Sequence, residues 1–249
     1  MENFKIDPNI SYDVVTLPSQ GIYYQNKKKT LRVAYLTAAD ENILSAPNLL
    51  QTDTVIEELL KRKILDKDID VDDLVIEDRQ AILIFSRNTA FGTDFKLKVT
   101  DPKTNEVFDA DVDLSVLKMK DFDLKPDENG EYPYYMDMSK VNVTFKFLNN
   151  QQEKELDKVK SSATGNIVAP TMTKRLEMMI QSINGNRDKL QIYEFIQNLP
   201  IKDSQNFKKF VAENKPGLDL IIDITTPSGE VVPIFVDFGV EFFRPFYGL

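Results

Sequence analysis

Hydrophobic positions along the first half of the chain alternate in some segments and follow helical spacing in others. Alternating or β-branched runs predict strands, whereas apolar residues three and four positions apart predict helices. Thr37, followed by Asp40 and Glu41, also predicts a helix start, because its side chain can cap and the helix dipole favours negative charge there. The predicted strands span residues 12–16, 30–36, 95–99 and 107–114, and the longer helices span residues 55–64 and 76–88.

The second half of the chain shows a similar order of patterns. Ser204 is a candidate cap for the last helix, and Pro200 ends the helix before it. The predicted strands span residues 141–147, 218–224 and 231–236, and the predicted helices span residues 151–160, 176–183, 190–196 and 205–214. Each half therefore reads as a strand or small sheet, several helices and a terminal hairpin, which is an α+β layout.

Matching residues support the interpretation that this order is a duplication. Pairs of equivalent residues lie 125 positions apart, and the offset slips by one residue after the last turn, as a one-residue deletion in a hairpin loop would produce. Such pairs are Phe85 and Phe210, Gly92 and Gly217, and Pro102 and Pro227. The sequence thus predicts two pseudo-duplicated lobes, residues 1–122 and 136–249, joined by a linker at residues 123–135 that is rich in Asp, Pro and Gly.

Composition limits the chemistry available to these lobes. The 249 residues include no cysteine and no histidine, the side chains most often used for zinc ligation, nucleophile activation and proton transfer near neutral pH. No Gly-x-Gly phosphate loop follows a predicted strand, and no pair of carboxylates stands out among the 40 acidic residues. We therefore expect a protein that is not an enzyme and needs no cofactor.

Charge and hydropathy restrict the partners. A net charge of −9 argues against nucleic acid, because binding phosphates requires Lys and Arg. The basic run at residues 27–29 reads as a solvated hairpin tip. No apolar run approaches the roughly 20 residues that span a bilayer, and residues 1–5 lack an apolar signal core. We expect no membrane partner and a location in the cytoplasm where the chain is made.

The acidic segment at residues 66–77 resembles a calcium-binding loop. Its carboxylates fall at positions one, three, five and twelve, as in an EF-hand. Val71 stands where a sharp turn is required, and Asp73 where an apolar residue is usual. Two interpretations remain open, namely a solvated loop that caps the following helix and a weak divalent-cation site. The four candidate ligands are Asp66, Asp68, Asp70 and Glu77.

The last residues form an aromatic tail with the composition of interface hot spots. The tail either completes the core of its own hairpin or presents its rings to a partner. Both interpretations hold together if the first two aromatic residues anchor the tail and the later two face outward. The candidate partner-binding residues are Phe242, Phe243, Arg244, Pro245, Phe246 and Tyr247.

An ordered set of short motifs carries a family resemblance. The motifs are Leu17-Pro18-Ser19-x-Gly21-x-Tyr23-Tyr24, Leu31-x-Val33-x-x-Leu36-Thr37, Ile183-Asn184-Gly185-x-x-Asp188, Leu199-Pro200-x-x-Asp203-Ser204 and Glu241-Phe242-Phe243-x-Pro245. Each motif alone is unspecific, but together, over the full length, the chain resembles the baseplate hub assembly proteins of T-even-type bacteriophages.

Relatives in that family often carry Cys-Pro-x-Cys-Gly at their hairpin tips, the spacing of a zinc-ribbon knuckle. The matching positions here are residues 101–104 and 226–229, which contain no cysteine. The resemblance therefore implies zinc-ribbon-like terminal hairpins that have lost their cysteines and hold no metal.

The resemblance implies a non-enzymatic chaperone or assembly factor that acts on other baseplate hub proteins of the phage and is absent from the mature virion. The alternative is a stoichiometric structural component of the hub. A third hypothesis, from a different class, is a calcium-responsive binding module built on Asp66 to Glu77.

Overall fold

The computed structural model describes residues 10–24, 26–45, 54–162, 169–236, 238 and 240–243. They form a mixed α/β protein with several small antiparallel sheets. The strands are β1 Tyr12–Thr16, β2 Thr30–Ala34, β3 Asp94–Thr100, β4 Val107–Asp113, β5 Tyr132–Met136, β6 Val141–Phe145, β7 Ile180–Ile183, β8 Ile221–Thr225 and β9 Val231–Phe235. The α-helices are α1 Ala38–Leu44, α3 Val55–Lys63, α4 Ile76–Phe91, α5 Asn150–Ser162, α6 Thr171–Met179, α7 Lys189–Gln197 and α8 Ile201–Asn214. Short 3-10 helices are η1 Val71–Asp73, η2 Leu114–Val116 and η3 Val240–Phe243.

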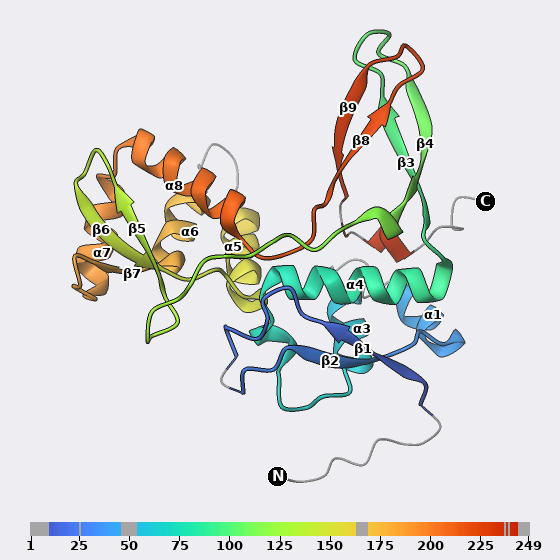
Figure 1. Cartoon of the computed structure of the whole chain (residues 1–249), viewed down its shortest axis with the longest axis horizontal. Helices are drawn as coiled ribbons and strands as arrows, with labels where there is room; N and C mark the ends of the chain where they lie inside the picture. Colours follow the sequence, from blue (N-terminus) through green and yellow to red (C-terminus); the bar gives the residue numbers. More distant parts are fainter. Residues whose placement is uncertain are drawn as a thin grey trace.

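The first body of the structure, defined as β1, β2, α1, α3 and α4, packs around one hydrophobic cluster. Helix α4 runs between the β1–β2 sheet and two upright hairpins (Figure 1). Its residues 81–84 are all buried, which is typical of a helix covered on every side. Among the helices described, α4 is the longest with 16 residues, and none of them combines the length and apolar character needed to cross a bilayer.

The start of α1 confirms the predicted cap at Thr37. The backbone N–H and the hydroxyl of Thr37 both donate to Asp40 Oδ2, at 2.7 and 2.8 Å. Asp40 is fully buried and also pairs with Lys63 and Arg62 at the end of α3. One carboxylate therefore starts α1 and fastens it to α3, because a buried charge is stable only when it is paired and hydrogen-bonded.

The second body consists of a three-stranded sheet in the order β5-β6-β7 with helices α5 to α8 around it (Figure 1). Its core is aromatic, with Phe145 and Phe207 fully buried and their ring centroids 5.2 Å apart in an edge-to-face arrangement. Such pairs stabilise a core beyond the area they bury.

Two predictions for the second body were wrong, and strand β5 includes the end of the predicted linker. Residues 176–183 have helical spacing, but α6 ends at Met179 and Ile180–Ile183 continues as β7, because it pairs with β6. Residues 132–135, the last four of the predicted linker, lie in strand β5. Pro133 is tolerated there because β5 is an edge strand. Helix α8 begins at Ile201 after Pro200, so Ser204 lies inside the helix and is not its cap.

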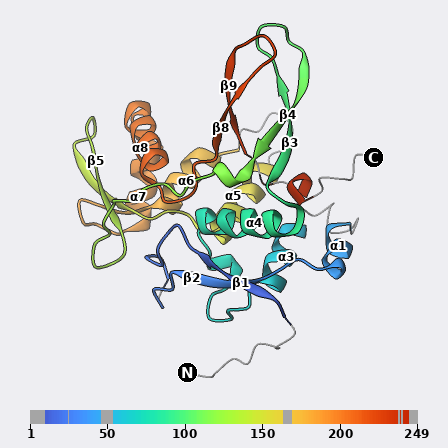
Figure 2. The same cartoon turned by 45° about the vertical axis from the view of Figure 1, so that its right-hand side comes forward.

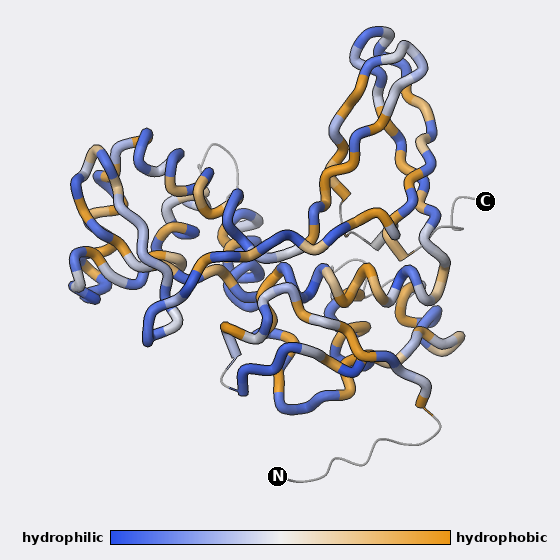
Figure 3. The backbone as a smooth tube through the Cα atoms, viewed as in Figure 1, coloured by the Kyte–Doolittle hydropathy of each residue, from blue (hydrophilic) through white to orange (hydrophobic). Residues whose placement is uncertain are grey.

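Two antiparallel hairpins, β3–β4 and β8–β9, stand side by side near the C-terminal end of α4 (Figures 1 and 2). Apolar residues run along their strands and polar residues occupy their adjoining tips (Figure 3). In β3–β4 the side chains of Val99, Ala110 and Val112 are buried. Alternating strands of this kind bury one face and leave the other to solvent.

The second hairpin belongs to the first hydrophobic cluster, although it is far from the first body in sequence. The residues that join this cluster from the chain's end are Leu220, Val236, Phe242 and Phe243. The hydrophobic cores therefore do not follow the predicted division into residues 1–122 and 136–249. That division stays a prediction about domains. The chain passes from the first hydrophobic cluster into the second body and returns to the first cluster with the last hairpin.

One pair of contacts recurs in both bodies. Asp78, in the first turn of α4, accepts hydrogen bonds from the Ser19 backbone N–H at 2.8 Å and hydroxyl at 2.5 Å. Asp203, in the first turn of α8, accepts from the backbone N–H of Ser139 at 2.8 Å and its hydroxyl at 2.6 Å. Asp78 and Asp203 are 125 positions apart, the offset found in the sequence.

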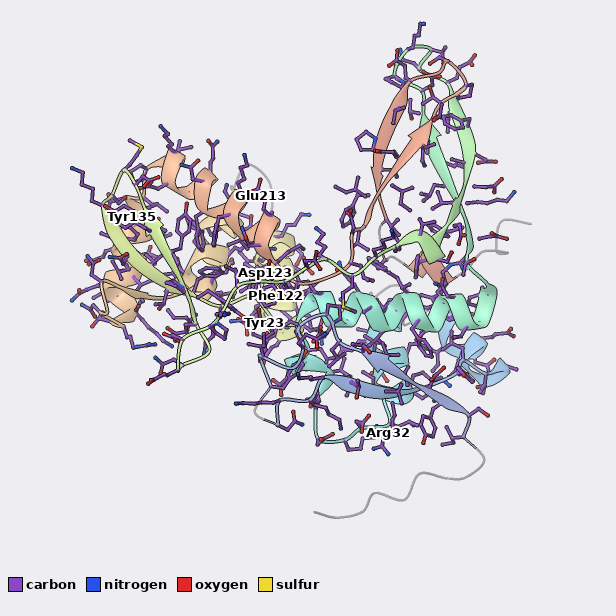
Figure 4. The ribbon with its side chains drawn as sticks, viewed as in Figure 1. Tyr23, Arg32, Phe122, Asp123, Tyr135 and Glu213 are labelled. Carbon is purple, nitrogen blue, oxygen red and sulfur yellow. The ribbon has the colours of Figure 1, made fainter. Side chains whose placement is uncertain are left out.

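An aromatic cluster joins the two bodies. The hydroxyl groups of Tyr23 and Tyr132 are 3.0 Å apart, and Phe122 and Phe147 pack edge-to-face against the Tyr132 ring. Figure 4 shows Tyr23 and Phe122 close together where the N-terminal end of α4 meets the second body. The cluster fixes how the chain passes from the first hairpin into the second body.

Polar contacts reinforce the same junction. The Asn150 N–H donates to the Leu74 carbonyl at 2.8 Å, which ties the start of α5 to the loop before α4. Lys154 of α5 pairs with Glu57 and with Asp72, both at 2.5 Å. The two bodies are therefore joined by backbone, aromatic and ionic contacts together.

We predict that Asp78→Ala destabilises the protein, because it leaves the buried donors of Ser19 and Tyr24 without an acceptor. Hydrogen bonds to charged groups are worth about 1.5–3 kcal/mol each, so we expect a loss of about 2–4 kcal/mol in urea unfolding followed by circular dichroism. The control is Asp123→Ala at an exposed site, which should stay within about 0.5 kcal/mol of the parent. Equal effects of the two substitutions would contradict this role of Asp78.

Candidate functional site

The acidic segment at residues 66–77 is held by cationic side chains. Asp66 Oδ1 lies 2.7 Å from Lys28 Nζ and 2.6 Å from Arg32 Nη2, and its other oxygen accepts the Arg32 backbone N–H. Asp68 pairs with the same lysine at 2.6 Å. These two carboxylates attach the β1–β2 hairpin to the loop that follows α3.

The other two candidate ligands point to different contacts. Asp70 accepts the backbone N–H of Asp72 at 3.0 Å and caps η1, whereas Glu77 is buried in the first turn of α4 beside Lys215 at 3.2 Å. Within the described ranges, no three or more acidic side chains are placed together to hold a metal ion. The structure therefore does not bring the four sequence candidates together.

Electrostatics at Asp66 follow from these contacts. Burial alone would raise the pKa of Asp66, but hydrogen bonds from Arg32 and Lys28 outweigh it and hold the pKa below its usual range. A carboxylate whose folded pKa is depressed contributes stability above its unfolded pKa and loses it as the pH falls. The contact is therefore a structural ion pair at neutral pH.

We predict that calcium up to about 5 mM produces no saturable heat in titration calorimetry, because ammonium and guanidinium groups already occupy Asp66 and Asp68. Lys28→Ala is the informative companion variant, since it removes the ammonium group that both carboxylates share and leaves Arg32 on Asp66. A saturable signal in the parent protein that Asp66→Asn removes would contradict the prediction.

The aromatic tail begins inside the core. Phe242 and Phe243 are each 1% exposed, and the Phe242 ring packs edge-to-face on Phe95 at 5.3 Å. The guanidinium of Arg87 lies 5.7 Å from the Phe242 ring centroid. Their assignment as partner contacts stays a prediction, but the structure gives both rings a packing role. The other predicted contacts, Arg244, Pro245, Phe246 and Tyr247, lie outside the described residues.

The two hairpin tips are joined to each other. Asp101 Oδ2 accepts the Ser228 backbone N–H at 3.0 Å, and its Oδ1 accepts the Ser228 hydroxyl at 2.9 Å and the Lys103 N–H at 2.9 Å. Residues 101–104 and 226–229, the positions expected to form knuckles, thus meet through hydrogen bonds. Their zinc-ribbon character stays a prediction.

The hydrogen bonds between Asp101 and Ser228, which we term the clasp of the hairpin tips, depend on the charge of Asp101. Loss of hydration opposes ionisation, but the donors from Lys103, Ser228 and Thr226 prevail and lower the pKa of Asp101 to about 2. Because the folded pKa lies below the unfolded value of about 3.9, the stabilisation is complete above that value and is lost as the pH falls toward 2.

We predict that the Ser228 amide signal in NMR spectra titrates with a midpoint near pH 2, and that Asp101→Ala abolishes this titration by removing the acceptor. The same substitution should broaden or shift the signals of residues 226–229 at neutral pH. Asp109→Ala on the exposed face of β4 is the matched control and should leave Ser228 unchanged. A Ser228 signal that ignores both the pH and Asp101→Ala would refute the clasp.

The outer faces of the two hairpins differ in chemistry. In β8–β9, Ile221 lies opposite Phe235, and Val231 lies opposite Thr225; the three apolar side chains are 56–59% exposed. With the exposed Pro233 they form what we term the apolar hairpin face, whose exposed polar residues are Asp223, opposite Pro233, and Thr225. The corresponding face of β3–β4 carries Lys96, Lys98, Asp109 and Asp111, with Val107 as its exposed large apolar residue.

Contiguous exposed apolar patches, unlike single exposed apolar residues, mark interaction sites on proteins. The sequence analysis predicted both hairpins but missed this face, because alternation shows that a strand has two faces and not which of them is covered. The relevant signal was the presence of apolar residues at outward positions of β8–β9 as well as inward ones, since Ile222 and Ile224 pack inward while Ile221 and Phe235 stay outside.

The comparisons with known proteins agree with the resemblance seen in the sequence. A family model described as "T4 bacteriophage base plate protein" matches residues 10–244. No curated protein and no solved structure matches the chain. Because the family model covers nearly the whole sequence, the chain belongs to the T4 bacteriophage base plate protein family.

Proposed function

We propose that this baseplate protein is a non-enzymatic assembly factor that promotes formation of the central hub of a contractile phage tail by binding other hub proteins. The observation that carries the proposal is the apolar hairpin face, which lies on a projecting hairpin and is uncovered in the isolated chain. Membership in the base plate family makes other baseplate proteins the natural partners for such a surface.

The side-chain chemistry supports binding and not covalent catalysis. The sequence offers no histidine or cysteine, and the notable acidic side chains serve structural contacts: Asp66 and Asp68 hold the first hairpin, Asp78 holds its turn, and Asp101 joins the hairpin tips. A group already engaged by donors is poorly placed to act as a general base.

A factor that acts during assembly and then leaves needs a contact that is specific and reversible. The apolar hairpin face offers a few large side chains, and such anchors contribute most of the binding free energy in small interfaces. Small interfaces dissociate readily, since affinity differences arise mainly in the dissociation rate. We propose that the protein acts in the host cytoplasm during assembly and is depleted from finished particles.

We also propose that the two bodies are versions of one duplicated unit. Each body begins with an antiparallel pair of strands, β1–β2 or β5–β6, and each is followed in the chain by a hairpin, β3–β4 or β8–β9. Asp78 and Asp203, in the first turns of α4 and α8, accept equivalent hydrogen bonds from Ser19 and Ser139, which supports this origin. A duplicated unit supplies two similar hairpins, of which one has kept a charged outer face and the other has become apolar.

We predict that Ile221→Glu together with Phe235→Glu weakens capture of co-expressed hub proteins at least tenfold, because a buried apolar contact would gain two uncompensated charges. Both positions are exposed, so circular dichroism and the urea midpoint should stay unchanged. Capture is measured by size-exclusion chromatography and pull-down. Lys98→Glu, on the charged face of β3–β4, is the control and should leave capture intact.

Undiminished capture by the double variant would remove the apolar hairpin face from the mechanism. In that case the tail becomes the alternative contact, and its test is truncation after Phe243, because a deletion from Phe242 onward would also remove two core rings. Quantitative mass spectrometry of purified particles separates the two roles. Depletion supports an assembly factor, whereas one copy per hub position would show a structural component.

A further inference from the structure

A cavity of about 280 Å³ lies between the N-terminal end of α4 and helices α5, α6 and α8 of the second body. Helices α6 and α8 supply most of its walls, and the start of α4 closes one side. The apolar lining includes Leu148, Met172, Leu176, Met179, Phe207 and Val211. Met172 is 62% exposed and stands at the mouth, while Leu176 and Met179 are buried below it.

A buried acid completes this cavity. Glu77 is 6% exposed, and its Oε1 lies 3.2 Å from Lys215 Nζ. Its Oε2 has no hydrogen-bond partner. Burial raises the pKa of Glu77, and Lys215 only partly opposes that effect. A buried carboxyl oxygen without a partner costs free energy, so a ligand that brings a hydrogen-bond donor to it gains that contact.

A cation marks the opposite end. Lys208 lines the cavity, is exposed, and has no ion pair with any described residue. It lies seven residues, or two helical turns, before Lys215, so about 10 Å of α8 separates it from the contact with Glu77. Arg175 also lines the cavity, but Glu153 holds its guanidinium through two bonds of 2.5 and 2.7 Å. Lys208 is therefore the cation available to a ligand.

We propose that this cavity binds a tryptophan side chain of a partner protein, with an acidic residue beside that tryptophan. The indole ring would fill the apolar lining, its N–H would donate to Glu77, and the neighbouring carboxylate would pair with Lys208. Tryptophan supplies a large apolar area with one donor at its edge, and buried indole N–H groups normally find an acceptor. It is also a residue enriched at interface hot spots.

The size and lining of the cavity argue against other ligands. Small-molecule pockets generally measure about 300–1,000 Å³, so this one suits a single large side chain better than a nucleotide or a cofactor. A hydrated metal ion would meet an apolar wall and two carboxylates that are already paired, Glu77 with Lys215 and Glu153 with Arg175. A lysine from the partner would face Lys208 and Lys215, which repel it.

This inference goes beyond the proposed function and depends on it only in naming another protein as the source of the tryptophan. The cavity lies at the N-terminal end of α4, whereas the apolar hairpin face stands on the hairpins near its C-terminal end (Figure 1). The two surfaces can therefore be tested separately.

The experiment follows the methyl signals of the seven methionines by NMR in the intact chain. The probe is acetyl-Trp-Glu-amide, and the matched controls are acetyl-Trp-Gln-amide, which lacks the carboxylate, and acetyl-Phe-Glu-amide, which lacks the indole N–H. We expect the probe to shift Met172 and Met179 saturably in the millimolar range and to leave Met119 unchanged. Each control should bind roughly threefold to tenfold more weakly.

Lys208→Gln should remove the preference for the Glu peptide over the Gln peptide and leave the spectrum of the free protein intact, since Lys208 is exposed. No saturable shift of Met172 and Met179 up to about 20 mM would overturn the proposal. Equal binding of all three peptides, or an unchanged preference in Lys208→Gln, would overturn it as well. The Ile221→Glu, Phe235→Glu variant should still bind the probe peptide. If it does so while it no longer captures hub proteins, the loss of capture is due to the apolar hairpin face alone.

Discussion

The first turn of α4 is the point on which the rest of the structure depends. It carries two buried carboxyl groups, and each binds a different part of the chain: Asp78 holds the turn of the β1–β2 hairpin, and Glu77 contacts Lys215 just after α8. The positive end of the helix dipole favours acidic groups at this position. Burial of two neighbouring carboxyls is nevertheless costly, so donors such as Ser19 and Tyr24 must be in place for the chain to fold this way.

The sequence revealed those parts of the fold that depend on the spacing of neighbouring residues. Elements that follow from local spacing, such as the hairpins and the helix itself, were predicted, and the cap at Thr37 was confirmed. Strand β7 was not, since Leu176 to Ile183 satisfy helical spacing and only pairing with β6 decides the outcome. The local pattern predicts most helices and strands. Where a segment fits both a helix and a strand, pairing with a strand distant in sequence decides which one forms.

The same reasoning applies to the candidate sites. The carboxylates at Asp66 and Asp68 matched a calcium loop in spacing, but Lys28 and Arg32, which occupy them, lie more than 30 residues earlier in the sequence. Likewise, the sequence showed Phe242 and Phe243 as an aromatic pair without showing that Phe95 and Arg87 already surround Phe242. In each case the residue types were informative, and the missing information was the neighbour across the fold.

The two surfaces proposed here are spaced by a rigid element. Helix α4 has 16 residues and so measures about 24 Å, with the tryptophan cavity at its first turn and the hairpins near its last. A partner that contacted both surfaces would bind the second one intramolecularly, which raises the effective concentration of that contact. It would also be held in one orientation, because two separated contacts fix rotation as well as position. The proposed assembly role would require such orientation of proteins that join in a defined order, and a helix anchored at both ends provides a fixed spacing for it.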